Sequence, residues 1–561
     1  MRPGPGRQHP PAAPDATGTP AAAPRPARAE RARDRHRYRR WLFVLAVVAL
    51  LTQMAVAMVT TAVRQTPTID EPVYVGAAEV YLREHSLRFN PEHPPLGKLV
   101  IASGLVFADV RLDPGFTGDQ TQLGRRVLYE SGNDPWRVML AARLPVILLT
   151  LLFGLVVTAF ARDLFGPAGA LVALALYAFS PDVIAHGSLA TLDVPATGFV
   201  LTSAWCLWRA RERPRLWLPL AGAALGAALA TKMSMLAAVP VVLLLVAVDR
   251  GKRRGWARGL AAAAGVGLVA VAVVWAAYLA VDPRLRWTTP EGVPAVHGLR
   301  GLVTSLLPFP EPYRDGMRLQ FGFENATWDG FLFGRHYHGA LWYYLPAALL
   351  VKTPLGMLVL WAAGAAALLA VPRLRPAAAY ALVLPLVLLA AAMTGSRDLG
   401  VRYAVFMPVF GAVAAAGVAV VRRRWVHMAA AALVAFVAVS SLRTFPYYLP
   451  YSNEAFGGPA RTHLRLHDSN VDWGQDLGRL ADRLKERYPG EPVWLVYKGS
   501  GVPSYYGIQA RNPLTVPPGQ VRGLLLVSDS SVAKAEGRLA ALLEEATPVD
   551  EVGHSITIYR R

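Results

Sequence analysis

Two adjacent carboxylates, Asp70 and Glu71, stand just after the first long apolar block of the sequence. Ionised carboxylates are costly to desolvate beside lipid, so such a pair lies either in water or in a polar cavity. A carboxylate held in a cavity is suited to act as a general base. A solvated loop start explains an isolated pair equally well, so the pair gains meaning only from its surroundings.

Cations occupy the ends of several other apolar blocks. Arg143 lies about one turn inside the second block, while Lys232, Arg397 and Arg402 stand at the ends of later ones. Long basic side chains at helix ends often reach toward water without any function. The rule that places Arg and Lys in cytoplasmic loops should nevertheless leave the opposite helix ends poor in them. A cluster of cations there fits an anionic head group, and a carboxylate pair beside it fits a general base.

Transmembrane helices are the elements that must position these residues. Of the 561 residues, 54% are hydrophobic and only 17% are charged. The hydrophobic residues form blocks of about 17 to 28 residues, each long enough to cross a hydrocarbon core of ~30 Å as a helix. The sequence therefore predicts an α-helical polytopic membrane protein. About eleven spans are expected, near 41–63, 139–161, 168–185, 194–209, 216–231, 233–248, 258–281, 341–370, 376–394, 401–421 and 425–442.

Arg-rich loops predict the orientation of these spans. If the basic N-terminus is cytoplasmic, short loops such as 209–215 and 249–258 are cytoplasmic as well, and nearly all of them are basic. The net charge of +20 then meets anionic lipid and not nucleic acid. An odd number of spans places the C-terminus outside. This pattern predicts a multi-pass plasma-membrane protein with a cytoplasmic N-terminus and an extracytoplasmic C-terminus.

Composition divides the chain into three predicted domains. Residues 1–40 are rich in Pro, Ala and Arg and predict a disordered basic cytoplasmic tail. Residues 41–443 form the transmembrane domain, with long outer loops at about 64–138 and 282–340. Residues 444–561 alternate charged helix-like stretches with short apolar ones, which predicts a small extracytoplasmic α/β domain. Its strands are expected at 493–497, 523–527 and 555–559.

The pair Asp70-Glu71, followed by His93-Pro94-Pro95-Leu96-Gly97-Lys98, resembles the dolichyl-phosphate-mannose protein mannosyltransferases and their bacterial polyprenyl-phosphate-dependent relatives in the GT-C superfamily. The similar segments run from the first outer loop to about residue 480. They include the segments around Arg143, Asp193, Lys232 and Lys352, the run Gly400-Val401-Arg402-Tyr403, and the run from Asp468 through Asp472 to Asp476.

This resemblance implies a GT-C-like helical fold and an inverting transfer of a sugar from a polyprenyl-phosphate donor to an acceptor hydroxyl at the outer face. Asp70 would be the general base, with Glu71 beside it. The implied phosphate-binding residues are Arg143, Lys232 and Arg402, and the implied substrate contacts are His93, Lys98 and Asp193. The acceptor stays open between a protein, a lipid and a glycan.

Other functions remain as alternatives. Charged residues within a helical bundle also suit a lipid-linked sugar flippase or transporter, although the two halves with matching broken helices that we expect of a transporter are not visible. A scaffold with cations that merely reach toward water is a third option. A lone histidine such as His93 is more often a structural hydrogen bonder than a ligand.

Metal binding is not assigned from this sequence. Asp468, Asp472 and Asp476 recur at a four-residue spacing that is typical of one helical face. A calcium loop requires a different spacing and a turning glycine. No cofactor is assigned, and dependence on a divalent metal stays open.

Overall fold

The computed structural model describes residues 1, 4, 6 and 26–561, with the side chains described from residue 37 onward within the last range. The expectation of a disordered tail over 1–40 falls mostly on residues outside the described ones. The described chain divides into two compact units, Met1–Ala46 and Val47–Arg561. Helix α1 runs over Pro26–Arg64 and so begins before the predicted first span.

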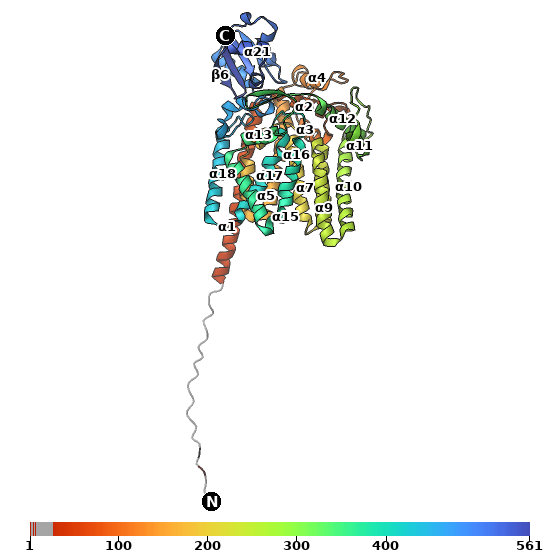
Figure 1. Cartoon of the computed structure of the whole chain (residues 1–561), viewed down its shortest axis with the longest axis vertical. Coiled ribbons are helices and arrows are strands. Elements are labelled where there is room, and N and C mark those ends of the chain that lie inside the picture. The colour runs from red at the N-terminus through yellow and green to blue at the C-terminus, as the bar shows by residue number, and fades with distance from the viewer. Residues whose placement is uncertain (2–3, 5, 7–25) are drawn as a thin grey trace. The chain divides into compact units, whose positions relative to one another are not determined.

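Every predicted span coincides with a helix or a run of helices (Figure 1). Six helices in the described part of the chain are long and apolar enough to cross a membrane, or seven if one bent pair counts as a single span. The predicted polytopic helical fold is confirmed, while the other predicted spans correspond to shorter or less apolar helices. After α1, the segments of the bundle are α5 (Pro135–Ala178), α7 (Asp193–Ala210), α8 (Pro214–Thr231), α9 (Ala238–Arg254), α10 (Trp256–Val281), α13 (Tyr344–Lys352), α14 (Leu355–Ala370), α16 (Leu384–Ala392), α17 (Phe406–Ala415) and α18 (Arg424–Thr444).

Helix α5 and one of the predicted spans are not straight, and glycine and proline explain the two departures. Helix α5 contains a break at Gly166, whose φ of 79° lies outside the helical region, and Pro167 follows it. The predicted span 341–370 is instead two helices, α13 and α14, which meet at an angle of 117°. Pro354 lies between them and excludes helical geometry from the residue before it.

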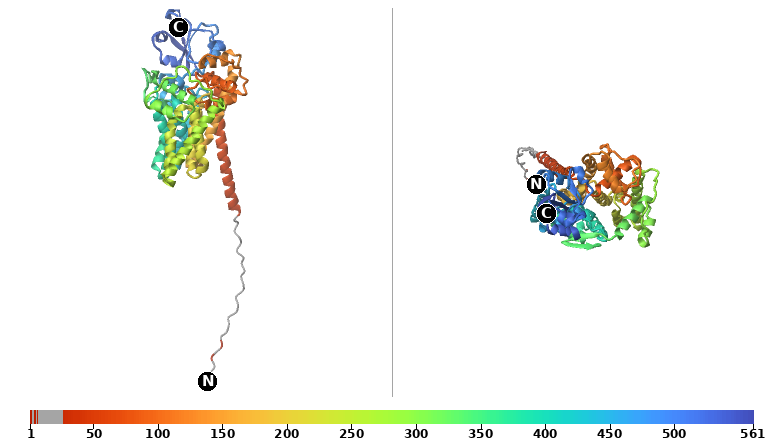
Figure 2. Two further views of the ribbon diagram at one scale, coloured as in Figure 1. Left: turned by 90° about the vertical axis from the view of Figure 1, so that its right-hand side faces the viewer. Right: turned by 90° about the horizontal axis from the view of Figure 1, so that it is seen from above.

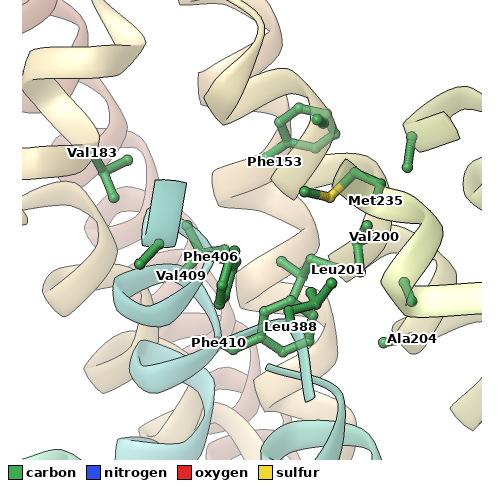
Figure 3. Packing of buried hydrophobic residues seen from close by; sticks show 14 of the residues in the cluster. Phe153, Val183, Val200, Leu201, Ala204, Met235, Leu388, Phe406, Val409 and Phe410 are labelled. Carbon is green, nitrogen blue, oxygen red and sulfur yellow. The ribbon is translucent and has the colours of Figure 1, made fainter. Parts of the chain in front are cut away.

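The core of the bundle is built from aliphatic and aromatic side chains of helices distant in sequence. Phe153 of α5, Leu201 of α7 and Phe410 of α17 are all buried in one cluster (Figure 3). Small residues permit close helix approach: a Cβ added at Gly364 of α14 would lie 2.2 Å from the carbonyl oxygen of Ala414. Such contacts replace the hydrophobic effect as the source of helix association inside lipid.

The long polar loops and the C-terminal sheet lie at one end of the bundle (Figures 1 and 2). The apolar segment 97–108 of the first loop is mostly the short helix α3. The elements contributed by the two loops are α2 (Glu71–Glu84), α3 (Pro95–Leu105), α4 (Gln120–Arg125), α11 (Gly298–Leu306), α12 (Glu311–Asn325) and the antiparallel hairpin of β1 (Asp329–Leu332) and β2 (Arg335–His338).

The C-terminal sheet has the strand order β4-β3-β5-β7-β6. Strand β3 is parallel to both β4 and β5, whereas β7 runs antiparallel to its neighbours. Alternate residues of β5 enter two cores: Leu524 and Leu526 pack on one face, Leu525 and Val527 on the other. The predicted small α/β fold is confirmed. Its elements are β3 (Val493–Val496), β4 (Ala510–Arg511), β5 (Leu524–Ser528), β6 (Thr547–Val552), β7 (Ile556–Arg560), α19 (Leu477–Arg487), α20 (Asp529–Ala533) and α21 (Gly537–Glu544).

Candidate active site

A cavity of about 600 Å³ lies where the first outer loop, α12, α16 and the segment 397–406 meet. One part of its wall is apolar, with Met233, Met317, Phe321, Leu388 and Phe406 among its residues. The acidic and basic residues of the lining are Asp70, Glu92, His93, Asp193, Lys232, Arg300, Glu324, Arg397, Asp398 and Arg402. The cavity therefore offers fixed charges of both signs beside an apolar surface.

Asp70 directly precedes α2 and directs its carboxylate to this cavity. Its side chain makes no capping hydrogen bond to the helix, which leaves the carboxylate free for other partners. It forms an ion pair with the guanidinium of Arg402. The loop before it is held by backbone hydrogen bonds: the amides of Thr66 and Ile69 donate to the carbonyls of Gln475 and Trp473, each at 3.0 Å.

Arg402 lies in the short helix η5 (Val401–Ala404) and is the cation nearest to Asp70 in the lining. Its guanidinium carbon lies 4.4 Å from the ring centroid of Trp473 and 5.1 Å from that of Tyr403. The Nε atom has no hydrogen-bond partner among the residues that the structure describes. Gly400 allows the backbone before Arg402 to lie close to Ser469. Its φ is 135°, and an added Cβ would lie 2.2 Å from the Ser469 hydroxyl.

Lys232 and Asp193 form a second ion pair in the lining. Lys232 lies in extended backbone between α8 and the short helix η2 (Met233–Ala237), while Asp193 is the first residue of α7. The ammonium also lies 5.1 Å from the ring centroid of Tyr403. The end of α8 and the start of α7 thus bring two opposite charges, which are 39 residues apart in the sequence, to one wall of the cavity.

Arg397 also lines the cavity, although the sequence placed it only among the outer cations and not among the implied phosphate-binding residues. Its Nη2 donates to Glu324 at 2.8 Å and to Gln320 at 2.7 Å. Glu324 and Gln320 come from α12, a helix in which the sequence reading named no candidate.

Glu71 and Arg143 do not reach the cavity. The Arg143 guanidinium donates to both carboxylate oxygens of Glu71, at 2.7 Å and 2.6 Å, and both side chains are fully buried. Thr68 and Ala190 also donate to Glu71, while the carbonyls of Ala62, Gln65 and Thr66 accept from Arg143. With every donor engaged inside the protein, Arg143 has none to offer a phosphate. These contacts favour a structural role for the pair, while its roles in catalysis and phosphate binding stay predictions.

Electrostatics agree with the structural assignment for Glu71. Burial by itself raises the pKa of a carboxyl, but the Arg143 guanidinium and the hydrogen bonds from Thr68 and Ala190 hold the pKa of Glu71 below its ordinary value. Glu71 is therefore an ionised partner for Arg143 and a poor proton acceptor.

Lys98 and His93 have different positions although one motif carries them. The Lys98 ammonium is fully buried and donates to the carbonyls of Asn90 and His93, at 2.6 Å and 2.9 Å, so it organises the loop without lining the cavity. His93 does line the cavity, and its Nδ1 has no hydrogen-bond partner in the described part of the chain. Burial, followed by the charges of Lys232 and Lys98, lowers the pKa of His93 well below its ordinary value. A neutral imidazole of this kind is suited to hydrogen bonding with a hydroxyl.

Among known protein families, one family model matches a part of this chain. Residues 137–278 match the family model described as dolichyl-phosphate-mannose-protein mannosyltransferase, a range that contains Arg143, Asp193 and Lys232. No curated protein matches the chain.

Three solved structures have a similar arrangement of elements over part or most of this chain. ArnT from Cupriavidus metallidurans bound to undecaprenyl phosphate has 18% identity and a TM-score of 0.49, over 92% of this chain and 97% of that one. The Archaeoglobus fulgidus oligosaccharyltransferase has 13% identity and a TM-score of 0.42, over 79% and 58%. The S. cerevisiae protein O-mannosyltransferase Pmt1-Pmt2 complex bound to the sugar donor has 18% identity and a TM-score of 0.32, over 43% and 32%.

At these scores and identities the solved structures carry no argument about function. The family model does carry an argument about function, because the sequence resemblance had already named the same family from residues on both sides of the matched range. The match supports that resemblance over residues 137–278, and with it the prediction that the chain is a glycosyltransferase.

Proposed function

We propose that this protein transfers a sugar, with inversion, from a polyprenyl-phosphate-linked donor to an acceptor hydroxyl at the outer face of the membrane. The observation that carries the proposal is the composition of one cavity, in which the carboxylate of Asp70 and the cations Arg402, Lys232 and Arg397 share a lining with apolar side chains. The apolar wall suits the lipid end of a donor, and the cations suit its phosphate.

The reaction makes one bond and breaks one. The acceptor oxygen attacks the anomeric carbon, Asp70 takes the hydroxyl proton, and the bond between the anomeric carbon and the phosphate oxygen breaks. The electron pair of that bond leaves with the lipid phosphate, whose added charge Arg402 and Lys232 stabilise. Asp193 holds Lys232 in place, and neutral His93 forms a hydrogen bond with a hydroxyl of the substrate.

The same proposal includes the organisation expected from the sequence. A cytoplasmic tail over 1–40 precedes a transmembrane transferase domain over 41–443, and residues 444–561 form the extracytoplasmic domain. This orientation puts the cavity at the outer surface, where a lipid-linked donor and an extracytoplasmic acceptor meet.

The test is replacement of the proposed base. Asp70→Asn is expected to fold and insert normally but to lose about 10²–10⁴-fold in transfer from a radiolabelled polyprenyl-phosphate hexose. Asp113→Asn is the matched control, because Asp113 is a half-exposed carboxylate of the same outer loop, paired with Arg126. Undiminished turnover by Asp70→Asn removes Asp70 from the role of base. Mass spectrometry of membrane glycoconjugates with and without the protein identifies the sugar and the class of acceptor.

A further inference from the structure

The carboxyl ends of strands β3 and β5 form an edge of the C-terminal sheet that faces another part of the same chain. The two strands are parallel neighbours, paired from Val493 with Leu524 to Val496 with Val527. Beyond such carboxyl ends an open α/β sheet has a crevice that commonly receives a ligand. Lys498 follows β3 here, while Ser528 and Ser530 lie at the end of β5 and just after it.

Segment 467–475 of the chain occupies this edge. The Lys498 ammonium forms an ion pair with Asp468. Ser530 accepts a hydrogen bond from the Asp468 amide at 2.8 Å and donates one to the Asp472 carbonyl at 3.1 Å. Ser530 and Asp472 are fully buried. The sheet edge therefore holds segment 467–475 through polar contacts at both Asp468 and Asp472.

The same segment holds the loop that carries the proposed base. The carbonyls of Trp473 and Gln475 accept from the amides of Ile69 and Thr66, each at 3.0 Å. The C-terminal domain also contacts this loop directly, because the Ser500 hydroxyl donates to the Thr68 carbonyl at 2.9 Å. The loop before Asp70 is thus fixed by backbone contacts that depend on segment 467–475.

The segment holds the phosphate-binding side of the cavity as well. Asn470 accepts from the Val401 amide at 3.0 Å, and the Ser469 hydroxyl donates to the Leu399 carbonyl at 2.6 Å. The Trp473 ring lies under the Arg402 guanidinium. One short segment therefore sets the positions of both Asp70 and Arg402, and the C-terminal sheet sets the position of that segment.

We propose that the C-terminal domain is a positioning device for the cavity, and that Lys498 and Ser530 are its positioning residues. The domain binds segment 467–475 where a free α/β domain of this kind binds a ligand, and through it holds Asp70 and Arg402 at their working separation. This inference rests on the proposed function for its catalytic consequence, but its structural consequence is measurable without turnover.

The test compares Lys498→Met with Arg483→Met in the full-length protein in lipid nanodiscs. Arg483 is the matched control, because it forms a partly exposed ion pair with Asp550 in the same domain and makes no contact with segment 467–475 in the part of the chain described. Lys498→Arg tests rescue by a retained charge. Ser530→Ala is the milder second variant should Lys498→Met fail to fold.

Two readouts decide the matter. In hydrogen exchange followed by mass spectrometry, the peptide that contains the Thr66 and Ile69 amides is expected to exchange at least tenfold faster in Lys498→Met and at the wild-type rate in Arg483→Met. In steady-state kinetics, kcat is expected to fall at least tenfold in Lys498→Met with both KM values within twofold, and to recover in Lys498→Arg.

Each other outcome overturns a stated claim. Unchanged exchange in Lys498→Met, or equal acceleration in Arg483→Met, overturns positioning by the sheet edge. Faster exchange with a wild-type kcat overturns the claim that positioning of the loop by the C-terminal domain affects the transfer reaction. If the wild-type protein transfers no sugar at all, the proposed function fails, while the exchange measurement still decides whether the C-terminal domain fixes the loop.

Discussion

At the scale of single residues, neighbours in the sequence have separate tasks. Asp70 and Glu71 are adjacent, yet the first faces a cavity and the second is enclosed with Arg143. Asp70 directly precedes α2 and Glu71 is its first residue, so their side chains point in different directions from the helix axis. The motif alone identified the pair as important, but only three-dimensional contacts distinguish a candidate base from a structural ion.

Glu71→Gln is expected to destabilise the protein without any change at the cavity lining. Removal of one member of a buried ion pair leaves the other charge uncompensated, at a cost of about 3–5 kcal/mol in the free energy of unfolding. The measurement is the melting temperature in detergent, with Asp70→Asn as the comparison variant that keeps wild-type stability. Because the folded-state pKa of Glu71 is lowered, the stability it contributes is present above the ordinary carboxyl pKa and is lost as pH falls through the folded value. An equal melting temperature for Glu71→Gln and wild type contradicts the structural role.

At the scale of elements, close contacts fix the position of α2 and hence of Asp70. An added Cβ at Gly124 of α4 would lie 2.4 Å from the Pro72 carbonyl oxygen in the first turn of α2. Gly265 of α10 has no neighbouring atom within 4 Å of the same added Cβ. The two glycines thus differ in packing, while both lie in helices.

Gly124→Ala is expected to push α4 away from α2 and to lower both stability and transfer rate, since overpacking costs about 1–3 kcal/mol. Gly265→Ala, the control, is expected to leave activity unchanged and to add slightly to helix stability, because alanine is the better helix former. Thermal unfolding and initial rates of the two variants are compared. Equal behaviour of both variants would show that the contact between α4 and α2 does not position Asp70.

Hydrophobic blocks and turn residues made most elements predictable from the sequence. Every expected span coincides with helical structure because long apolar runs have few other options in lipid. The bend between α13 and α14 was missed, although Pro354 marks it. Strands β4 and β6 were missed because β4 has two residues and β6 includes Pro548, so neither shows a clear alternating pattern.

Site residues were less predictable, because charge and spacing do not reveal partners. Lys232 and Arg402 do line the cavity with Asp70, whereas Arg143, an arginine at a similar helix end, is enclosed by Glu71 and backbone carbonyls. The four-residue spacing of Asp468, Asp472 and Asp476 indicated one helical face, but the segment is a short turn at Asp468–Asn470 followed by irregular backbone. These differences arise from contacts between segments that are distant in the sequence, by 72 residues for Glu71 and Arg143 and by 332 for Asp70 and Arg402.

At the scale of the whole molecule, the C-terminal sheet contacts segment 467–475 at a buried acidic group. Asp472 is fully buried, and its Oδ1 accepts from the Gly474 amide at 3.0 Å. Burial raises the pKa of Asp472 to about 7, against the opposing hydrogen bonds from Gly474 and Ser528. The native protein therefore keeps a proton on Asp472 in a pH range where the unfolded chain has lost it.

The ordinary pKa of an aspartic acid is about 4, and the folded-state pKa of Asp472 is about 7. The free energy of unfolding is therefore expected to fall as pH rises between these two values and to level off above the second. The sign follows from linkage, since the folded state binds more protons than the unfolded state across this window. Asp472→Asn carries a neutral amide at every pH, so its advantage over wild type should grow across the window by about 1.4 kcal/mol for each unit of pKa difference. Calorimetric melting in nanodiscs at a series of pH values measures that difference, with Asp482→Asn as the control for an exposed carboxyl of the same domain. If the stability of wild type and of Asp472→Asn changes with pH in parallel, Asp472 is ionised in the folded protein. The contact between the sheet and segment 467–475 then does not depend on a proton on Asp472.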